Sequence, residues 1–251
     1  MKRSKLCGGV AMLAMFASIH SASALNGTYS FITTVSCIEV KVTDAQQGGA
    51  PPANCNGDPA QCPAFDAQTL RALPGFFAYD AFTAPTVGTA RFNRDGTMTF
   101  KGTSLSTFLA SVSVALERTG GPAGTDGFPF NTFAPVSYAA SQSEIAGAAN
   151  YTTDDNNRIF LTNETASGTF LAGARTGQTF VNTGRPDAVG LLSGNGDSPQ
   201  SIQVSDTPTT PAIEVFAITV PSLGANDTFQ RICSRSTTFQ LLPNSFDDTG
   251  Q

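Results

Sequence analysis

The four cysteines after residue 24 are the residues whose type and spacing most clearly predict chemistry. Cys37, Cys55, Cys62 and Cys233 are an even number, and such a set in a chain that leaves the reducing cytoplasm is typical of two disulfides. We favour a short Cys55–Cys62 link in a loop rich in proline and glycine, and a long Cys37–Cys233 link from the first strand to the last. The other two pairings stay open. Thiolate metal sites usually use CxxC spacings, which are missing, so we expect no metal site.

Histidine chemistry is excluded from the same part of the chain. The only histidine, His20, precedes residue 25, so no Ser-His-Asp, Cys-His or histidine-zinc site can form after it. Carboxylate-only mechanisms such as glycoside hydrolysis remain open, although the glutamates are scattered and no acid–base pair can be identified. We therefore expect no enzyme, no catalytic residue and no cofactor, and we keep a carboxylate hydrolase as the weakest alternative.

The first 24 residues have the pattern of a cleavable signal peptide. Lys2, Arg3 and Lys5 are followed by an apolar stretch over 10–19 and by small residues at 21–24, so residues 1–24 are the predicted leader. The apolar stretch is shorter than the ~20 residues that cross a bilayer. The alternative is a short anchor that is not removed. We expect an exported protein, periplasmic or extracellular, with no integral membrane span.

Cleavage would make the chain more acidic and would exclude one class of partner. The formal charge of −5 becomes −8, because the three leader charges are all positive, and only Lys41 and Lys101 remain as lysines. A chain without a basic surface has little to hold the phosphates of a nucleic acid, so we expect no nucleic-acid partner.

Residues 25–251 have the pattern of a single all-β domain. Short runs of phenylalanine, valine, isoleucine and threonine alternate with clusters of glycine, asparagine, aspartate and proline, and helical periodicity is nearly absent. In the longest run, 29–42, the apolar positions change from odd to even, which predicts a bulge near Ser36-Cys37. Further strands are predicted at 110–117, 158–163, 188–193, 200–205, 212–220 and 228–241.

Two hairpins can be predicted in more detail. Over 90–100, a three-residue loop Arg94-Asp95-Gly96 pairs Phe92 with Met98 and Ala90 with Phe100, with Gly96 in the left-handed conformation. A second hairpin is predicted to turn at 175–177. The run Asp154-Asp155-Asn156-Asn157 could suggest a calcium loop, but it lacks the glycine and the distant glutamate of an EF-hand, so we interpret it as a hairpin turn.

Residues 44–75 interrupt the strand pattern as a long insertion loop. It contains the proposed Cys55–Cys62 link and a short helix from Asp66 to Leu73, stopped by Pro74-Gly75. An aromatic cluster overlaps and follows its end, and it is either a lid over an apolar ligand pocket or ordinary core. These candidate ligand-binding residues are Phe65, Phe76, Phe77, Tyr79 and Phe82.

The start of the predicted mature chain, Leu25-Asn26-Gly27-Thr28-Tyr29-Ser30-Phe31, resembles the first strand of lipocalin-like and avidin-like barrels, in which a glycine precedes an aromatic residue. It is also similar to exported bacterial β proteins with Phe-x-x-Asp-Gly hairpins, here 92–96. The resemblance implies a single antiparallel β-barrel whose first and last strands are neighbours, and a late arginine, Arg231 or Arg235, packed across the first-strand aromatic ring. A β-sandwich is the alternative fold.

Two functions follow as expectations. The first is a non-enzymatic barrel that binds a small hydrophobic molecule in an enclosed apolar cavity. The second is a structural or protein-interaction module of the bacterial envelope, which would show an apolar surface patch or an open strand edge. An outer-membrane barrel is disfavoured because the chain has no tryptophan and four tyrosines for interfacial girdles.

Overall fold

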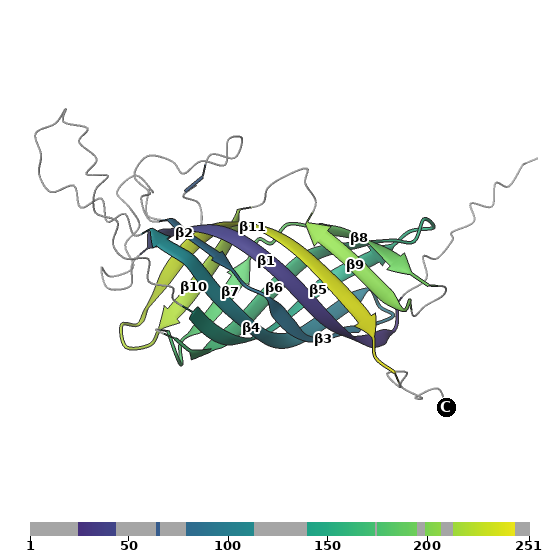
Figure 1. The fold of residues 1–251 in the computed structure, drawn as a ribbon, viewed down its shortest axis with the longest axis horizontal. Helices are drawn as coiled ribbons and strands as arrows, with labels where there is room; N and C mark the ends of the chain where they lie inside the picture. Colours follow the sequence, from purple (N-terminus) through teal and green to yellow (C-terminus); the bar gives the residue numbers. More distant parts are fainter. Residues whose placement is uncertain are drawn as a thin grey trace, which may run out of the picture.

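The structure, a computed structural model, describes residues 25–43, 64–65, 79–112, 140–173, 175–194, 199–206 and 213–243. All the elements in these ranges are strands, and the strands form one antiparallel sheet (Figure 1). Within the described residues no helix could cross a membrane by length and apolar character. The strands are β1 (Gly27–Thr43), β2 (Tyr79–Thr83), β3 (Thr86–Phe92), β4 (Thr97–Val112), β5 (Ala140–Thr153), β6 (Arg158–Ala172), β7 (Thr179–Thr183), β8 (Ala188–Ser193), β9 (Ser201–Asp206), β10 (Glu214–Val220) and β11 (Ala225–Leu241).

The sheet curls into a ring of eight strands, β1-β3-β4-β5-β6-β7-β10-β11, because β11 pairs with β1. Five positions of the ring are filled by the long strands β1, β4, β5, β6 and β11. Each of the other three positions is filled by two short strands that follow each other in the chain: β2 with β3, β7 with β8, and β9 with β10. The fold is therefore all-β and barrel-like, built from one sheet instead of the two sheets of a sandwich. The short helix predicted at 66–73 lies outside the described residues.

The bulge predicted near Ser36-Cys37 is wrong. The β1–β11 register runs without interruption from Tyr29 to Lys41 and shifts only between Lys41 and Thr43. The apolar residues Val40 and Val42 are instead buried on the outer face, where Ala64 and Phe65 pack over them. The strand keeps its alternation, and a segment from elsewhere in the chain covers its outer side.

Both predicted hairpins are confirmed. Phe92 pairs with Met98 and Ala90 with Phe100, and Gly96 has a φ of 82°. The β6–β7 connection turns at 175–177. The 154–157 segment is the β5–β6 turn, in which the Asp154 carboxylate accepts hydrogen bonds from the backbone N–H groups of Asn156 and Arg158, each at 3.0 Å.

Strand β5 was not among the predicted strands, and one glycine of its partner β6 shows how tightly the sheet is curved. A β-carbon on Gly168 would lie 2.0 Å from the Glu144 carbonyl oxygen, a distance that no real side chain tolerates. The Phe180 ring lies over the same position, so the missing side chain allows both the close approach of β5 and the inward packing of the ring.

Side chains on the inner face of the ring form three layers. One end holds the tyrosine cluster, in which the Phe92 ring makes edge contacts with Tyr29, Tyr151 and Phe239. The other end holds the phenylalanine cluster, Phe170, Phe180, Phe216 and Phe229 with Ile218. Between them the inward positions carry charged and polar side chains beside a small apolar cluster of Val35, Cys37, Phe82 and Ala84, and this middle layer contains the candidate site.

Candidate functional site

The middle layer surrounds a cavity of about 270 Å³, here called the chamber, and a smaller neighbouring cavity of about 60 Å³. Arg185 and Arg235 are the two charged residues that line both cavities. The chamber wall combines rings of the phenylalanine cluster with hydroxyl, amide and guanidinium groups. It includes Phe82, Phe170, Phe180, Phe216, Ser104, Ser141, Ser143, Asn182, Arg175, Arg185, Glu214, Arg231 and Arg235.

Arg231 connects the ion pairs of the chamber to its aromatic wall. Its Nε lies 2.5 Å from Oε2 of Glu39, a side chain that is 1% exposed. The guanidinium carbon lies 3.3 Å from the centroid of the Phe216 ring and 4.8 Å from that of Phe82. The strand register explains the pair, because Glu39 of β1 is the direct cross-strand partner of Arg231 on β11.

Arg235, four residues further along β11 and on the same face, pairs with two carboxylates. It contacts Glu214, and its Nη1 lies 3.3 Å from Oδ2 of Asp206. The Asn182 side-chain amide donates a 2.9 Å hydrogen bond to Oε2 of Glu214. Arg185, which follows β7, contacts Glu164 of β6. Four separate strands thus supply carboxylates to three buried guanidinium groups.

Burial shifts the pKa values of Arg185, Arg231 and Asp206. Desolvation, reinforced by repulsion from Arg235, lowers the pKa of Arg185 to about 9, so its guanidinium is still protonated at neutral pH. Desolvation also lowers the pKa of Arg231, against the attraction of Glu39. The pKa of Asp206 is raised, again chiefly by desolvation, although Arg235 opposes the shift. The chamber therefore holds its charges in an environment that penalises them.

Several buried polar atoms of the middle layer have no hydrogen-bond partner within the described part of the chain. They are Nε of Arg185, Nε of Arg235, Oδ1 of Asn182 and Oε1 of Glu39. A buried polar atom without a partner costs about 1–3 kcal/mol, so such atoms mark places where water or a ligand binds favourably.

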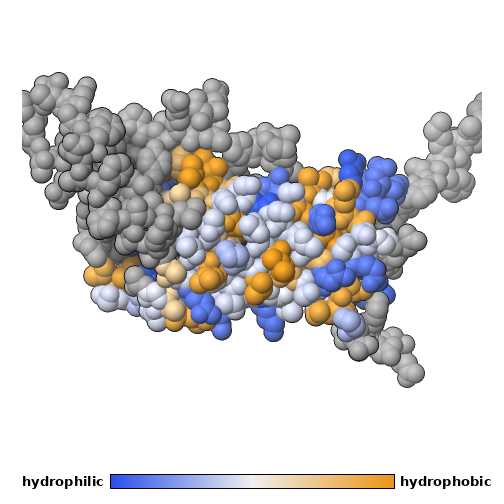
Figure 2. All heavy atoms as spheres, viewed as in Figure 1, coloured by the Kyte–Doolittle hydropathy of each residue, from blue (hydrophilic) through white to orange (hydrophobic). Residues whose placement is uncertain are grey.

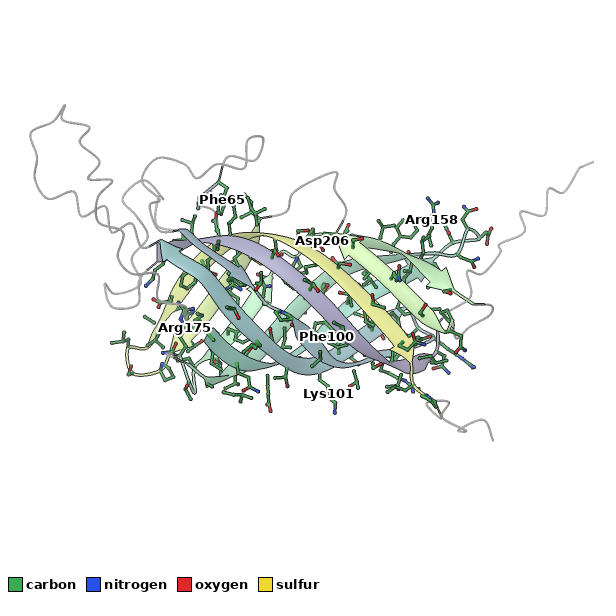
Figure 3. The ribbon with its side chains drawn as sticks, in the orientation of Figure 1. Phe65, Phe100, Lys101, Arg158, Arg175 and Asp206 are labelled. Atoms are coloured by element: carbon green, nitrogen blue, oxygen red, sulfur yellow. A yellow bond between two sulfur atoms is a disulfide. The ribbon has the colours of Figure 1, made fainter. Side chains whose placement is uncertain are left out.

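Arg175 differs from the other three arginines of the chamber. It lies in the β6–β7 turn, is only half-buried, and its guanidinium carbon stands 4.9 Å from the centroid of the Phe229 ring. Among the described residues no carboxylate forms an ion pair with it. Figure 3 shows Arg175 near the end of the ring formed by β7 and β10, opposite the end that carries Arg158.

The predicted disulfide between the first and last strands is confirmed. Cys37 and Cys233 are direct partners in the β1–β11 pairing, are bonded to each other, and both line the chamber. The proposed Cys55–Cys62 link lies outside the described residues.

The structure does not bring the aromatic residues predicted for ligand binding together. Phe82 faces inward and lines the chamber, whereas Phe65 packs on the outer face of β1. The backbone of Tyr79 pairs with that of Val40 in β1. Phe76 and Phe77 lie outside the described residues.

The arginine implied over the first-strand aromatic ring has a different place. Arg231 packs on Phe216 and Phe82, while Tyr29 packs against Phe92 and donates a hydrogen bond to the Pro199 carbonyl. The carboxylates Glu39, Glu164 and Glu214 were recognised in the sequence only as scattered residues. The signal that could have located the site was the alternation of Arg231, Cys233 and Arg235, which places all three on one face of a strand.

No metal-binding group of histidine, cysteine, aspartate or glutamate side chains is present in the described ranges. No family model matches the chain, and no curated protein is significantly similar to it. Among solved structures, the chain is similar to the TodX deltaS2S3 mutant monoaromatic hydrocarbon channel, with 8% identity over 87% of this chain and 91% of that chain and a TM-score of 0.18. A likeness at that level carries no argument about function.

Proposed function

We propose that the chain is an exported, non-enzymatic binding protein that holds one small molecule inside its ring of strands. The observation that carries the proposal is the chamber itself, a cavity of about 270 Å³ whose wall combines aromatic rings with buried polar atoms that lack partners. Aromatic rings pack favourably against the apolar part of a ligand. A ligand that also forms hydrogen bonds with the unpartnered polar atoms binds more tightly.

The size of the chamber limits the ligand. Cavities of about 150 Å³ bind benzene, so a chamber of this volume suits one or two rings with a polar substituent. Eight-stranded closed sheets have interiors that are filled by side chains or hold one small ligand, which agrees with this range. The wholly apolar ligand expected from the sequence fits less well, because the chamber wall carries Glu214 and four arginines.

Export and the lack of catalysis belong to the same proposal. The signal-peptide pattern of residues 1–24 and the Cys37–Cys233 disulfide support a periplasmic or extracellular location. The absence of histidine after residue 20 removes most acid–base mechanisms, which leaves Glu164, Asp206 and Glu214 as the cavity-lining carboxylates that a hydrolase would use. Arg185 holds Glu164 in an ion pair, and Arg235 holds Asp206 and Glu214.

The alternative, an interaction module of the envelope, has less support from the described surface. Ile32 of β1 and Val87 of β3 form one exposed apolar cross-strand pair, while Leu105 and Leu191 lie on other strands. Figure 2 shows hydrophobic residues interspersed with polar ones on the face in view. The pairing of β1 with β11 also closes the ring, so neither of these strands offers an open edge.

Native mass spectrometry of protein purified from its own host tests the proposal. We expect a fraction of the wild-type protein to carry an additional small mass. Ser143→Phe would fill the chamber and remove that mass, while Ser167→Phe, the same change at an exposed outer position of β6, would keep it. A bare wild-type mass, with no ligand found by screening, would contradict the proposal.

A further inference from the structure

We infer that the ligand is an aromatic or apolar carboxylate, bound with its carboxylate at Arg175 and its body against the phenylalanine cluster. The inference rests on the proposed function and specifies the chemical class of the molecule in the chamber. It depends on the charges of the chamber wall, on the unpartnered donors, and on the rings beside Arg175.

The charges of the chamber wall favour an anionic ligand. Arg185, Arg231 and Arg235 each have a carboxylate partner among the described residues, whereas Arg175 is paired only with the face of a phenylalanine ring. Four guanidinium groups line the chamber against one carboxylate, Glu214. An anionic ligand would therefore gain a partner without displacing an existing ion pair, and a cationic ligand would meet repulsion.

Buried hydrogen-bond donors of the chamber wall favour a ligand with acceptor oxygens. Nε of Arg185 and Nε of Arg235 are buried donors without acceptors within the described ranges, and both residues line the chamber. Such donors favour a ligand with acceptor oxygens. A second polar substituent, at the end of the ligand away from Arg175, would accept hydrogen bonds from them. The Asn182 amide oxygen, also without a partner, adds one acceptor to the same wall.

The phenylalanine cluster provides an apolar surface for the body of the ligand. Phe170, Phe180 and Phe216 are consecutive neighbours in the phenylalanine cluster, with ring centroids 5.0–5.1 Å apart, and all three line the chamber. Arg175 stands on Phe229, the next ring of that cluster after Phe216. A carboxylate attached directly to a ring system could therefore reach Arg175 while its ring packs on these phenylalanines.

Isothermal titration with three isosteric probes tests the charge preference. The probes are naphthalene-2-carboxylate, the neutral naphthalene-2-carboxamide and the cationic naphthalen-2-ylmethylammonium. We expect the carboxylate to bind at least about tenfold more tightly than the carboxamide, the effect of one charged hydrogen bond, and the ammonium to bind weakest. Arg175→Gln should remove the preference for the carboxylate, because it weakens carboxylate binding far more than carboxamide binding. Arg94→Gln, the same change at an exposed turn, should alter neither affinity.

The outcomes separate the two proposals. If the carboxamide or the ammonium binds as tightly as the carboxylate, or if Arg175→Gln keeps the preference, this inference is overturned while the binding function stands. If none of the probes binds and the protein from its host is bare, both proposals fall. If none binds but the host protein carries a molecule, a carboxylate in that molecule supports the inference and a neutral or cationic molecule overturns it.

Discussion

Cys37 of β1 and Cys233 of β11 lie directly opposite each other inside the ring, with their α-carbons 4.1 Å apart, and their disulfide joins the two strands whose pairing closes the sheet. Arg231 and Arg235 flank Cys233 on the same inward face of β11, and Glu39 follows Cys37 on the inward face of β1. The covalent link that closes the ring therefore also fixes the strands that carry the charged groups of the chamber.

Replacing both cysteines, Cys37→Ser with Cys233→Ser, should destabilise the protein strongly. The disulfide spans 196 residues of chain, and a loop of that length is worth up to about 5 kcal/mol in the chain-entropy model. Denaturant unfolding of the oxidised protein measures the loss. The matched control is Ser36→Ala with Ser234→Ala, the adjacent outward-facing pair of the same two strands, which should cost less than about 1 kcal/mol. Equal losses in the two double variants would contradict the role of the disulfide.

Glu39→Gln should cost about 3 kcal/mol of unfolding free energy, because it leaves the buried Arg231 guanidinium without its counter-charge. Asp227→Asn provides the comparison, since it weakens the partly exposed pair with Lys41 and should cost under about 1 kcal/mol. Urea unfolding of both variants at one pH gives the two values. A loss at Glu39 no larger than that at Asp227 would show that the Glu39–Arg231 pair adds nothing beyond a surface contact.

Tyr29 should make the protein sensitive to alkaline pH. Burial, with a smaller contribution from Tyr151, raises the pKa of Tyr29 to about 12, against 10.0 for the free side chain. Between these values the unfolded chain loses a proton that the folded protein keeps. The stability contributed by Tyr29 is therefore complete below pH 10 and is lost as the pH rises towards 12, by up to about 2.7 kcal/mol.

The comparison with Tyr29→Phe isolates this effect. At pH 8 the variant should be about 1 kcal/mol less stable, because the Pro199 carbonyl loses its hydrogen bond. The difference should shrink and then reverse as the pH approaches 12. The lowered pKa of Arg185 acts in the opposite direction over this range but is present in both proteins, so it cancels. A difference in stability that does not change with pH would contradict the assignment.

Gly168→Ala should disrupt the ring at β5 and β6, because the added methyl group would lie 2.0 Å from the Glu144 carbonyl oxygen and against the Phe180 ring. We expect a loss above about 3 kcal/mol, seen as a large fall in Tm or as failure to recover folded protein. Ser167→Ala, one residue earlier on the outer face, should change the stability by less than about 0.5 kcal/mol. An unchanged Tm for Gly168→Ala would show that the sheet tolerates a wider spacing here.

Features set by neighbouring residues could be predicted from the sequence, whereas most features set by distant residues, the Cys37–Cys233 disulfide excepted, could not. The 90–100 hairpin was predicted with its register because the turn glycine and the side-chain alternation act within a few residues. The bulge in β1 was predicted wrongly because Phe65, which covers Val40 and Val42, comes from a separate segment. Strand β5 was missed because its alanine, serine and glycine residues have low strand propensity, and its pairing with β4 and β6 overrides that propensity.

The candidate site was harder to predict for the same reason. The Cys37–Cys233 link followed from counting cysteines and from their positions near the two ends of the domain. The pairing of Glu39 with Arg231 required the β1–β11 register, which joins residues 192 apart in the chain. Scattered charges in the sequence thus become a site only when the ring closes.

The most direct test of ligand binding in the chamber is a methyl NMR titration with naphthalene-2-carboxylate, observing Ile145 and Ile32. Ile145 lines both the chamber and the smaller cavity, whereas Ile32 is 61% exposed on the outer face. We predict a saturable shift of the Ile145 methyl signals with no change at Ile32. A shift at Ile32 alone, or no shift at either residue in a protein whose form purified from the host carries no molecule, would contradict the proposal that the ring encloses a binding site.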